Sequence, residues 1–391
     1  MFSIGTINLE ILQKNAYNLR WATVPEGVIP LTAADPDYPC APEITESIIK
    51  YAKDRYFSYG PTEGQPFFKE AMACYFNNKR NIPASAAFIL PVDSAAFGID
   101  VVCRAQLEKG DEAIVFDPVD FLFKYAIEKN GAIAKSCPIS TDPSDYFDIT
   151  KLQSLVSPRT KMICLCNPLN PIGKVFKRSE LQAIGEFAIE HDLTILSDEI
   201  WSEITFKPFE FVSIASLDEK IRERTILVTG FSKSHGLAGL RIGAIAAFDP
   251  NHYKSIVEAS FHESTIHGSN VLSQVAATAA LNQSEYWLTA FKEHLHSIRD
   301  LTINGLNAIN GFSCHFPQGC YLAFVNIKET GLDSATLYKQ LYEVGKVAVV
   351  PGLVKWFGKG AEGYIRISFA TSHEIMAEAL ERINNSINQI H

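Results

Sequence analysis

One lysine, Lys233, stands in a run from Gly230 to Gly243 that holds four glycines, an alanine and, eight positions after the lysine, Arg241. Glycine lets the backbone approach a bulky ligand closely. A lysine in a partly desolvated, cation-rich site has a lowered pKa and can attack a carbonyl, and arginine offers a planar fork to a phosphate. An amine with a phosphate anchor is what pyridoxal phosphate requires. A surface lysine on a glycine-rich turn is the alternative.

Two polar residues follow strand-like segments and have the chemistry to hold a pyridine ring. Asn170, in the turn 167–173, carries an amide that can donate to a phenolate oxygen. Asp198 follows the apolar segment 193–197, where a carboxylate is costly unless it is paired. A protonated pyridine nitrogen is such a partner. A plain turn at Asn170 and a helix N-cap at Asp198 are the alternatives.

Further residues suit the recognition of an amino acid and of a phosphate. Arg366 lies in the apolar strand 364–368 and therefore needs an anionic partner. That partner is either a substrate α-carboxylate bound by two parallel hydrogen bonds or a structural ion pair. The small residues Ala33 and Ala34 let main chain approach a substrate, and Tyr59 has a hydroxyl that can reach a phosphate.

The centre of the chain alternates short apolar segments with helical patterns. The apolar segments predict buried strands at 113–116, 162–166, 193–197 and 225–229, and a helix is predicted between two of them at 179–191. This alternation predicts a mostly parallel sheet that is covered by helices on both faces. Ligands of such sheets bind at the carboxyl ends of the strands, and the residues singled out above fall at those ends.

The pattern changes near residue 284 and indicates a smaller α+β domain. We expect a long helix at 286–309, strands at 320–325, 347–350 and 364–368, and a last helix from Ser372. The first forty residues are irregular and rich in aromatic side chains. The predicted organisation is therefore an N-terminal segment, 1–40, that packs on the small domain or a partner subunit, a large domain, 41–283, and a small domain, 284–391.

Composition excludes several classes of protein. Of 391 residues, 47% are hydrophobic and 20% are charged, and the net charge is −9 without a basic patch. A nucleic-acid partner is therefore not expected. We also expect no secretory signal and no bilayer span. None of the eight cysteines forms a Cys-x-x-Cys pair; Cys164 and Cys166 share one face of a predicted strand. Buried free thiols in a reducing cytoplasm, with no metal, are expected.

On these motifs the chain closely resembles the class I/II aminotransferases, pyridoxal-phosphate enzymes of fold type I, over nearly its whole length. The match is most specific from Gly230 to Gly243. The resemblance implies an α/β fold whose large domain has a seven-stranded, mostly parallel sheet, together with the smaller domain. It also implies that Lys233 forms a Schiff base with the cofactor and moves protons at the substrate's Cα. Asp198 would pair with the pyridine nitrogen, and Asn170 with the phenolic oxygen.

The resemblance also implies roles for residues around the phosphate and the substrate. Arg241 and Ser232 would lie near the phosphate, and Tyr59 would reach the phosphate of the partner subunit in a homodimer. Arg366 would hold the substrate carboxylate with the help of Asn170 and of main chain at Ala34. Ser269 and Asn270 would extend across the dimer interface.

The sequence departs from the family pattern at three places. Trp201 stands where the family usually has tyrosine, and an indole cannot act as an acid as a phenol does. The phosphate turn lacks its usual glycine near Asp93, so the backbone donors are expected at Ser94 and Ala95. An ungapped match puts Asp120 where an aromatic side chain usually stacks on the cofactor ring; Phe121 is predicted to take that role, with Phe123 behind it.

The predicted function is the transfer of an amino group between an L-amino acid and a 2-oxo acid. A cystathionine β-lyase-like carbon–sulfur lyase is the alternative, because the run 34–38 partly matches that subgroup. A non-catalytic regulator on this fold is a third class, which the retained Lys233 disfavours. Aromatic residues suggest an aromatic or large neutral substrate, whereas Arg20 leaves an acidic one open; the aromatic residues are Tyr17, Trp21, Tyr38 and Phe121.

Overall fold

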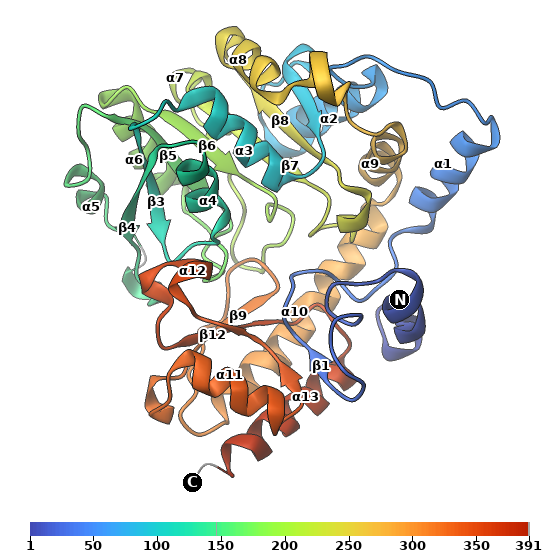
Figure 1. Cartoon of the computed structure of the whole chain (residues 1–391), viewed down its shortest axis with the longest axis vertical. Helices are drawn as coiled ribbons and strands as arrows, with labels where there is room; N and C mark the ends of the chain where they lie inside the picture. The colour runs from blue at the N-terminus through green and yellow to red at the C-terminus, as the bar shows by residue number, and fades with distance from the viewer. Residues whose placement is uncertain (146, 390–391) are drawn as a thin grey trace.

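The computed structural model describes residues 1–145 and 147–389 and consists of a large sheet layer above a smaller layer (Figure 1). The large sheet has seven strands in the order β2-β8-β7-β6-β5-β3-β4. β8 is antiparallel to both of its neighbours, β2 and β7, and all the other pairs of neighbouring strands are parallel. The strands span β2 Ile89–Val92, β3 Glu112–Asp117, β4 Ile133–Pro138, β5 Thr160–Cys166, β6 Thr194–Asp198, β7 Thr225–Gly230 and β8 Gly243–Ala247.

Helices cover both faces of this sheet. Helices α3 and α4 join strands that follow one another towards the β4 edge of the sheet, whereas α6 and α7 join strands that follow one another towards the β2 edge. Because crossovers between parallel strands are right-handed, the two pairs of helices lie on opposite faces. The helices of this layer are α1 Pro42–Lys53, α2 Pro66–Arg80, α3 Ala95–Gln106, α4 Leu122–Lys129, α5 Thr150–Gln153, α6 Arg178–Glu190, α7 Glu219–Glu223, α8 Pro250–Ser260 and α9 Val271–Gln283. Across the described residues, no helix is both long and apolar enough to cross a membrane.

The smaller layer is built on a three-stranded antiparallel sheet in the order β11-β12-β9. Its strands are β9 Leu322–Asn326, β11 Val350–Pro351 and β12 Tyr364–Ser368. The long helix α10 runs from the large layer into the smaller one (Figure 1). The helices here are α10 Glu285–Asn307, α11 Ser334–Glu343, α12 Val354–Phe357 and α13 His373–Ile387.

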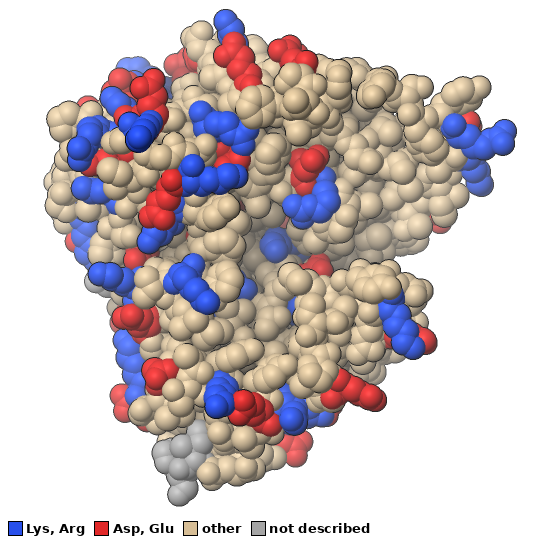
Figure 2. Space-filling view, viewed as in Figure 1, with Lys and Arg blue, Asp and Glu red and all other residues tan. Residues whose placement is uncertain are grey.

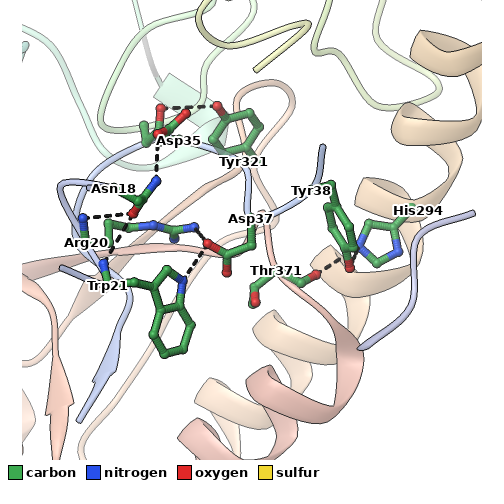
Figure 3. A network of polar contacts seen from close by, with 10 residues as sticks. Asn18, Arg20, Trp21, Asp35, Asp37, Tyr38, His294, Tyr321 and Thr371 are labelled. Atoms are coloured by element: carbon green, nitrogen blue, oxygen red, sulfur yellow. Dashed lines mark hydrogen bonds and ion pairs between the residues drawn. The ribbon is translucent and has the colours of Figure 1, made fainter. Parts of the chain in front are cut away.

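The N-terminal segment lies along the smaller layer. Its strand β1, Ile29–Pro30, pairs in parallel with β10, Val347–Ala348. Arg20 is fully buried and forms an ion pair with the buried Asp37, which also accepts a hydrogen bond from Trp21 Nε1 at 2.7 Å (Figure 3). An uncompensated charge at such depth would be costly, so each of these residues needs the other, and the pair joins two parts of the segment.

The predicted fold class, a mostly parallel seven-stranded sheet with a smaller α+β part, is confirmed. Strands predicted at 113–116, 162–166, 193–197 and 225–229 correspond to β3, β5, β6 and β7. The prediction of one strand at 347–350 is wrong, because this segment divides into β10 and β11, which belong to different sheets. Cys164 and Cys166 are buried free thiols, as predicted.

Candidate active site

A cavity of about 300 Å³ lies between the two layers, at the carboxyl ends of the large-sheet strands. Figure 2 shows a hollow on this face, with basic side chains at its floor. The lining holds every predicted site residue except Phe121 and Tyr59, namely Ala34, Ser94, Ala95, Asn170, Asp198, Trp201, Ser232, Lys233, Arg241 and Arg366. Residues about three hundred positions apart in the sequence therefore meet in one cavity.

Lys233 lies in the loop that joins the antiparallel neighbours β7 and β8. Its Nζ donates to the carbonyl oxygen of Ala34 at 2.7 Å and lies 5.5 Å from the centre of the Trp201 ring. Burial lowers the pKa of the Lys233 amine, whereas the negative charge of Asp35 opposes that shift. A lowered pKa makes more of the amine neutral and nucleophilic.

Asp198 is the last residue of β6, and the interior there is unfavourable for an unpaired carboxylate. Its Oδ1 accepts a hydrogen bond from the backbone N–H of Ile200 at 3.1 Å. Burial raises the pKa of Asp198 to about 7. A cation placed beside this group would favour its charged form, so the site suits a protonated ring nitrogen.

Asn170 connects the Arg366 guanidinium to the Asp120 carboxylate across the cavity. Its Oδ1 accepts a hydrogen bond from Arg366 Nη1 at 3.1 Å, and its Nδ2 donates to Asp120 Oδ2 at 2.9 Å. The same Nη1 of Arg366 lies 3.8 Å from Asp120 Oδ2. Arg366 Nη2 donates to the carbonyl of Thr32 at 3.1 Å, and Nε is buried without a hydrogen-bond partner. The guanidinium therefore retains a donor for a ligand.

The other end of the cavity suits a phosphate. Ser94 caps α3 by accepting a hydrogen bond from the N–H of Phe97 at 3.0 Å, and the first N–H groups of a helix attract anions. Ser232 and the exposed Arg241 line the same cavity. An added Cβ at Gly243 would lie 2.8 Å from the N of Ala95. Gly243 thus lets β8 pack against the start of α3, a role distinct from ligand approach.

Two predicted site residues lie elsewhere. Phe121 is displaced from the predicted stacking position, since its ring packs against Trp356 with centroids 5.3 Å apart, while Asp120, Leu122 and Phe123 line the cavity. Tyr59 is 91% exposed, in the loop between α1 and α2. Its phenol is therefore free for a contact outside its own chain.

Three further sets of predicted residues lie outside the cavity lining. Ser269 Oγ donates to the carbonyl of Pro91 at 3.1 Å, and Asn270 caps α9. Arg20 is 0% exposed beside Asp37, so it is not available to an acidic substrate. The four aromatic residues suggested for substrate recognition lie outside the cavity lining, namely Tyr17, Trp21, Tyr38 and Phe121. They therefore give no support to an aromatic substrate.

Sequence reasoning missed Tyr321. This buried residue donates its hydroxyl hydrogen to the carbonyl of Ala34 at 3.2 Å, the oxygen that also accepts from Lys233 (Figure 3 shows Tyr321). Its ring meets that of Trp201 edge to face, with centroids 4.7 Å apart. The only sequence signal was its place at the start of a predicted apolar strand.

Comparison with known proteins agrees with this geometry. The family model "Aminotransferase class I and II" matches residues 26–383. An aspartate aminotransferase of Pyrococcus abyssi is 32% identical, over 93% of this chain and 92% of its own. The aromatic aminotransferase of Pyrococcus horikoshii has a TM-score of 0.88 at 28% identity, and the alignment covers 94% of this chain and 97% of that one.

Cystalysin from Treponema denticola, solved with pyridoxal 5'-phosphate, has a TM-score of 0.91 over 100% of this chain and 99% of its own. At 22% identity this likeness extends to the fold alone. The family match and the relatives named as aminotransferases do not favour the lyase alternative. The chain therefore belongs to the class I and II aminotransferases and is a pyridoxal-phosphate-dependent transferase.

Proposed function

We propose that this protein moves an amino group between an L-amino acid and a 2-oxo acid, and that the Lys233 amine holds the cofactor covalently. The observation that carries the proposal is the meeting of three groups in one cavity: the Lys233 amine, the buried Asp198 carboxyl and the Arg366 guanidinium. Such a reaction needs an amine that binds the cofactor, a carboxyl group that pairs with the ring nitrogen, and a guanidinium that binds the substrate carboxylate.

The residues present fit pyridoxal phosphate. Asp198 would pair with the pyridine nitrogen, and Asn170 would contact the phenolic oxygen. The phosphate would lie at the start of α3, held by backbone N–H groups near Ser94 and Ala95 and by the side chains of Ser232 and Arg241. Trp201 lies against the Lys233 amine and would shape the ring's surroundings. When bound, the cofactor withdraws electrons from the substrate's α-carbon.

The chain's own groups would perform the remaining work. Arg366, with main chain at Ala34, would hold the α-carboxylate. Lys233 would then remove the proton from the substrate's α-carbon, because a lowered pKa leaves more of its amine neutral and able to accept a proton. Trp201 can donate a hydrogen bond but cannot lend a proton as an acid, so acid–base work is left to Lys233.

A single-turnover experiment tests this proposal. Cofactor-loaded protein is mixed with one amino acid at a time and no 2-oxo acid, while cofactor absorbance and released products are followed. One equivalent of 2-oxo acid per site, without ammonia, supports amino-group transfer and names the donor. Release of pyruvate, ammonia and thiol from a sulfur amino acid would instead establish the lyase.

We further propose a homodimer in which Tyr59 reaches the partner's phosphate. Exposed apolar side chains gather in the loop between α1 and α2 and in the segment 261–266, namely Tyr56, Phe57, Tyr59, Phe261 and Ile266. Such exposed apolar groups are typical of an interface. A cytoplasmic location is proposed because all eight cysteines are free thiols, as expected in a reducing compartment.

A further inference from the structure

One charged group in the cavity is left over after the proposed function has used the others. The lining holds five charged side chains, namely Asp120, Asp198, Lys233, Arg241 and Arg366. The cofactor would use Asp198, Lys233 and Arg241, and the substrate carboxylate would use Arg366. Asp120 has no role in that scheme, although it stands where the family places an uncharged aromatic ring.

Asp120 lies beside Arg366, the residue that would bind the substrate carboxylate, and Asn170 bridges the two side chains. Asn170 donates to Asp120 Oδ2 at 2.9 Å and accepts from Arg366 Nη1 at 3.1 Å, and this Nη1 is 3.8 Å from the same Asp120 oxygen. Asp120 is therefore the counter-ion of Arg366. Arg366 lines the cavity and its Nε has no hydrogen-bond partner, so the guanidinium has a donor left for a second anion.

Two carboxylates beside one guanidinium would repel each other strongly. Several elements present a charged or titratable group to Asp120: Arg366 on β12, Lys233 after β7, Asp198 at the end of β6 and Cys166 at the end of β5. Burial raises the pKa of Asp120 even though Arg366 and Lys233 lower it. A second carboxylate would raise that pKa further, as it does when two acids share a site.

We propose that Asp120 neutralises Arg366 in the substrate-free enzyme, and that the substrate carboxylate binds Arg366 together with one proton, which Asp120 takes up from solvent. Before binding, one negative carboxylate faces the guanidinium. After binding, the substrate's carboxylate supplies that charge and Asp120 is neutral, so the charge of the subsite is unchanged. Asp120 is thus a positioning and specificity residue that makes carboxylate affinity depend on pH. The inference rests on the proposed role of Arg366.

The test measures proton uptake on binding of an unreactive carboxylate to the cofactor-loaded enzyme. The probe is 3-phenylpropanoate, which lacks the amino group, and binding is followed by calorimetry in two buffers of different ionisation enthalpy. The wild type is expected to take up more protons than Asp120→Asn. Above the titration of Asp120, wild-type affinity should fall by about tenfold per pH unit, and that of Asp120→Asn should fall less. Cofactor absorbance verifies that each variant is loaded.

The variants separate failure of this inference from failure of the proposed function. If Arg366→Ala binds the probe as the wild type does, the carboxylate does not bind Arg366, and the proposed role of Arg366 fails. If binding depends on Arg366 but wild type and Asp120→Asn take up equal numbers of protons, only the role of Asp120 is overturned. Asp120→Ser replaces Asp120→Asn if that variant does not load cofactor, and flat wild-type affinity across pH overturns the inference without any variant.

Discussion

At Lys233, burial and charge act on the amine in opposite directions. Burial and the cation Arg366 lower its pKa, whereas the carboxylates of Asp35, Asp120 and Asp198 raise it. Burial is the largest of these influences, and the net shift is downward. A surface lysine, bathed in solvent, would stay protonated at neutral pH. The surroundings of Lys233 therefore suit an amine that reacts, which the glycine-rich sequence alone could not distinguish from an exposed one.

Lys233→Ala is expected to abolish covalent attachment of the cofactor and to lower turnover by about 10²- to 10⁴-fold or more, the range for loss of a positioned acid–base group. Borohydride reduction followed by peptide mass analysis measures the attachment. Lys124→Ala is the matched control, because Lys124 lies on α4 with its side chain half exposed beside Glu128. A labelled peptide that persists in Lys233→Ala would contradict the assignment.

The buried carboxyl of Asp198 should make the free energy of unfolding depend on pH. Its pKa is about 7 in the folded chain and about 3.9 when unfolded, so the folded state binds more protons between these values. The stability of the cofactor-free protein therefore falls as pH rises from about 4 to about 7. Asp198→Asn removes this cost, and its gain in free energy of unfolding should be larger at about pH 8.5 than at about pH 5 by roughly 2–3 kcal/mol.

Urea unfolding of the cofactor-free wild type and Asp198→Asn at both pH values measures that difference. Glu199 also has a pKa raised by burial to about 7, and the charge of Asp198 is the smallest of the causes that act on it. Because Glu199 is present in both proteins, most of its effect cancels. An equal gain at the two pH values would show that Asp198 is not titrating as its burial implies.

Among the elements, long apolar runs could be predicted from sequence, whereas short paired strands could not. The segments 162–166 and 225–229 form central strands because burial on both faces requires a continuous apolar run. The segment 347–350 has the same character, yet β10 pairs with β1 and β11 pairs with β12. Strands of two residues form because of the segments they pair with, which lie far away in the sequence, so the local sequence pattern does not predict them.

The same distinction holds for the site. The placement of Asn170 and Asp198 in the cavity could be predicted, because the carboxyl ends of parallel strands meet at one edge of a sheet. Phe121 could not, because it begins a helical turn where neighbouring side chains point about 100° apart, so a shift of one residue exchanges it with Asp120. Tyr321 was missed because its role depends on a carbonyl at Ala34, far away in the sequence.

The junction of β8 with α3 gives a prediction at the scale of elements. A Cβ on Gly243 would lie 2.7 Å from the oxygen of Thr229 and 2.8 Å from the nitrogen of Ala95. Since both neighbours are backbone, Gly243→Ala must push β8 away from the start of α3. We expect a loss of roughly 1–3 kcal/mol in the free energy of unfolding, as for overpacked cores, and weaker cofactor binding.

Gly239→Ala is the matched control from the same glycine-rich run, because nothing lies within 4 Å of its added Cβ. Urea unfolding compares the two variants with the wild type, and fluorescence titration with pyridoxal phosphate measures affinity. Equal stability of Gly243→Ala and Gly239→Ala would mean that the close packing of β8 on α3 is not what requires glycine at 243.

At the scale of the whole molecule, the site is complete only because separate regions of the chain each contribute residues to it. The segment 32–35 contributes carbonyls to Lys233 and Arg366, β12 contributes Arg366, and the sheet contributes the remaining groups. The β1–β10 pairing holds the N-terminal segment against the smaller layer, and the fully buried Arg20–Asp37 pair joins two parts of that segment. By contrast, Tyr59 projects into solvent from a single chain. In the proposed homodimer, a second copy of the chain would give this phenol a partner.

Subunit mixing tests this proposal for the whole molecule. Tyr59→Ala and Lys233→Ala should each impair the enzyme, the first through the phosphate and the second through the amine. If Tyr59 acts on the partner's site, a mixed dimer contains one site with both native residues, and the other site lacks both. Random refolding of an equal mixture makes half of the dimers mixed, so about a quarter of wild-type activity should return. If Tyr59 instead served its own site, each site of a mixed dimer would lack one residue and mixing would restore nothing.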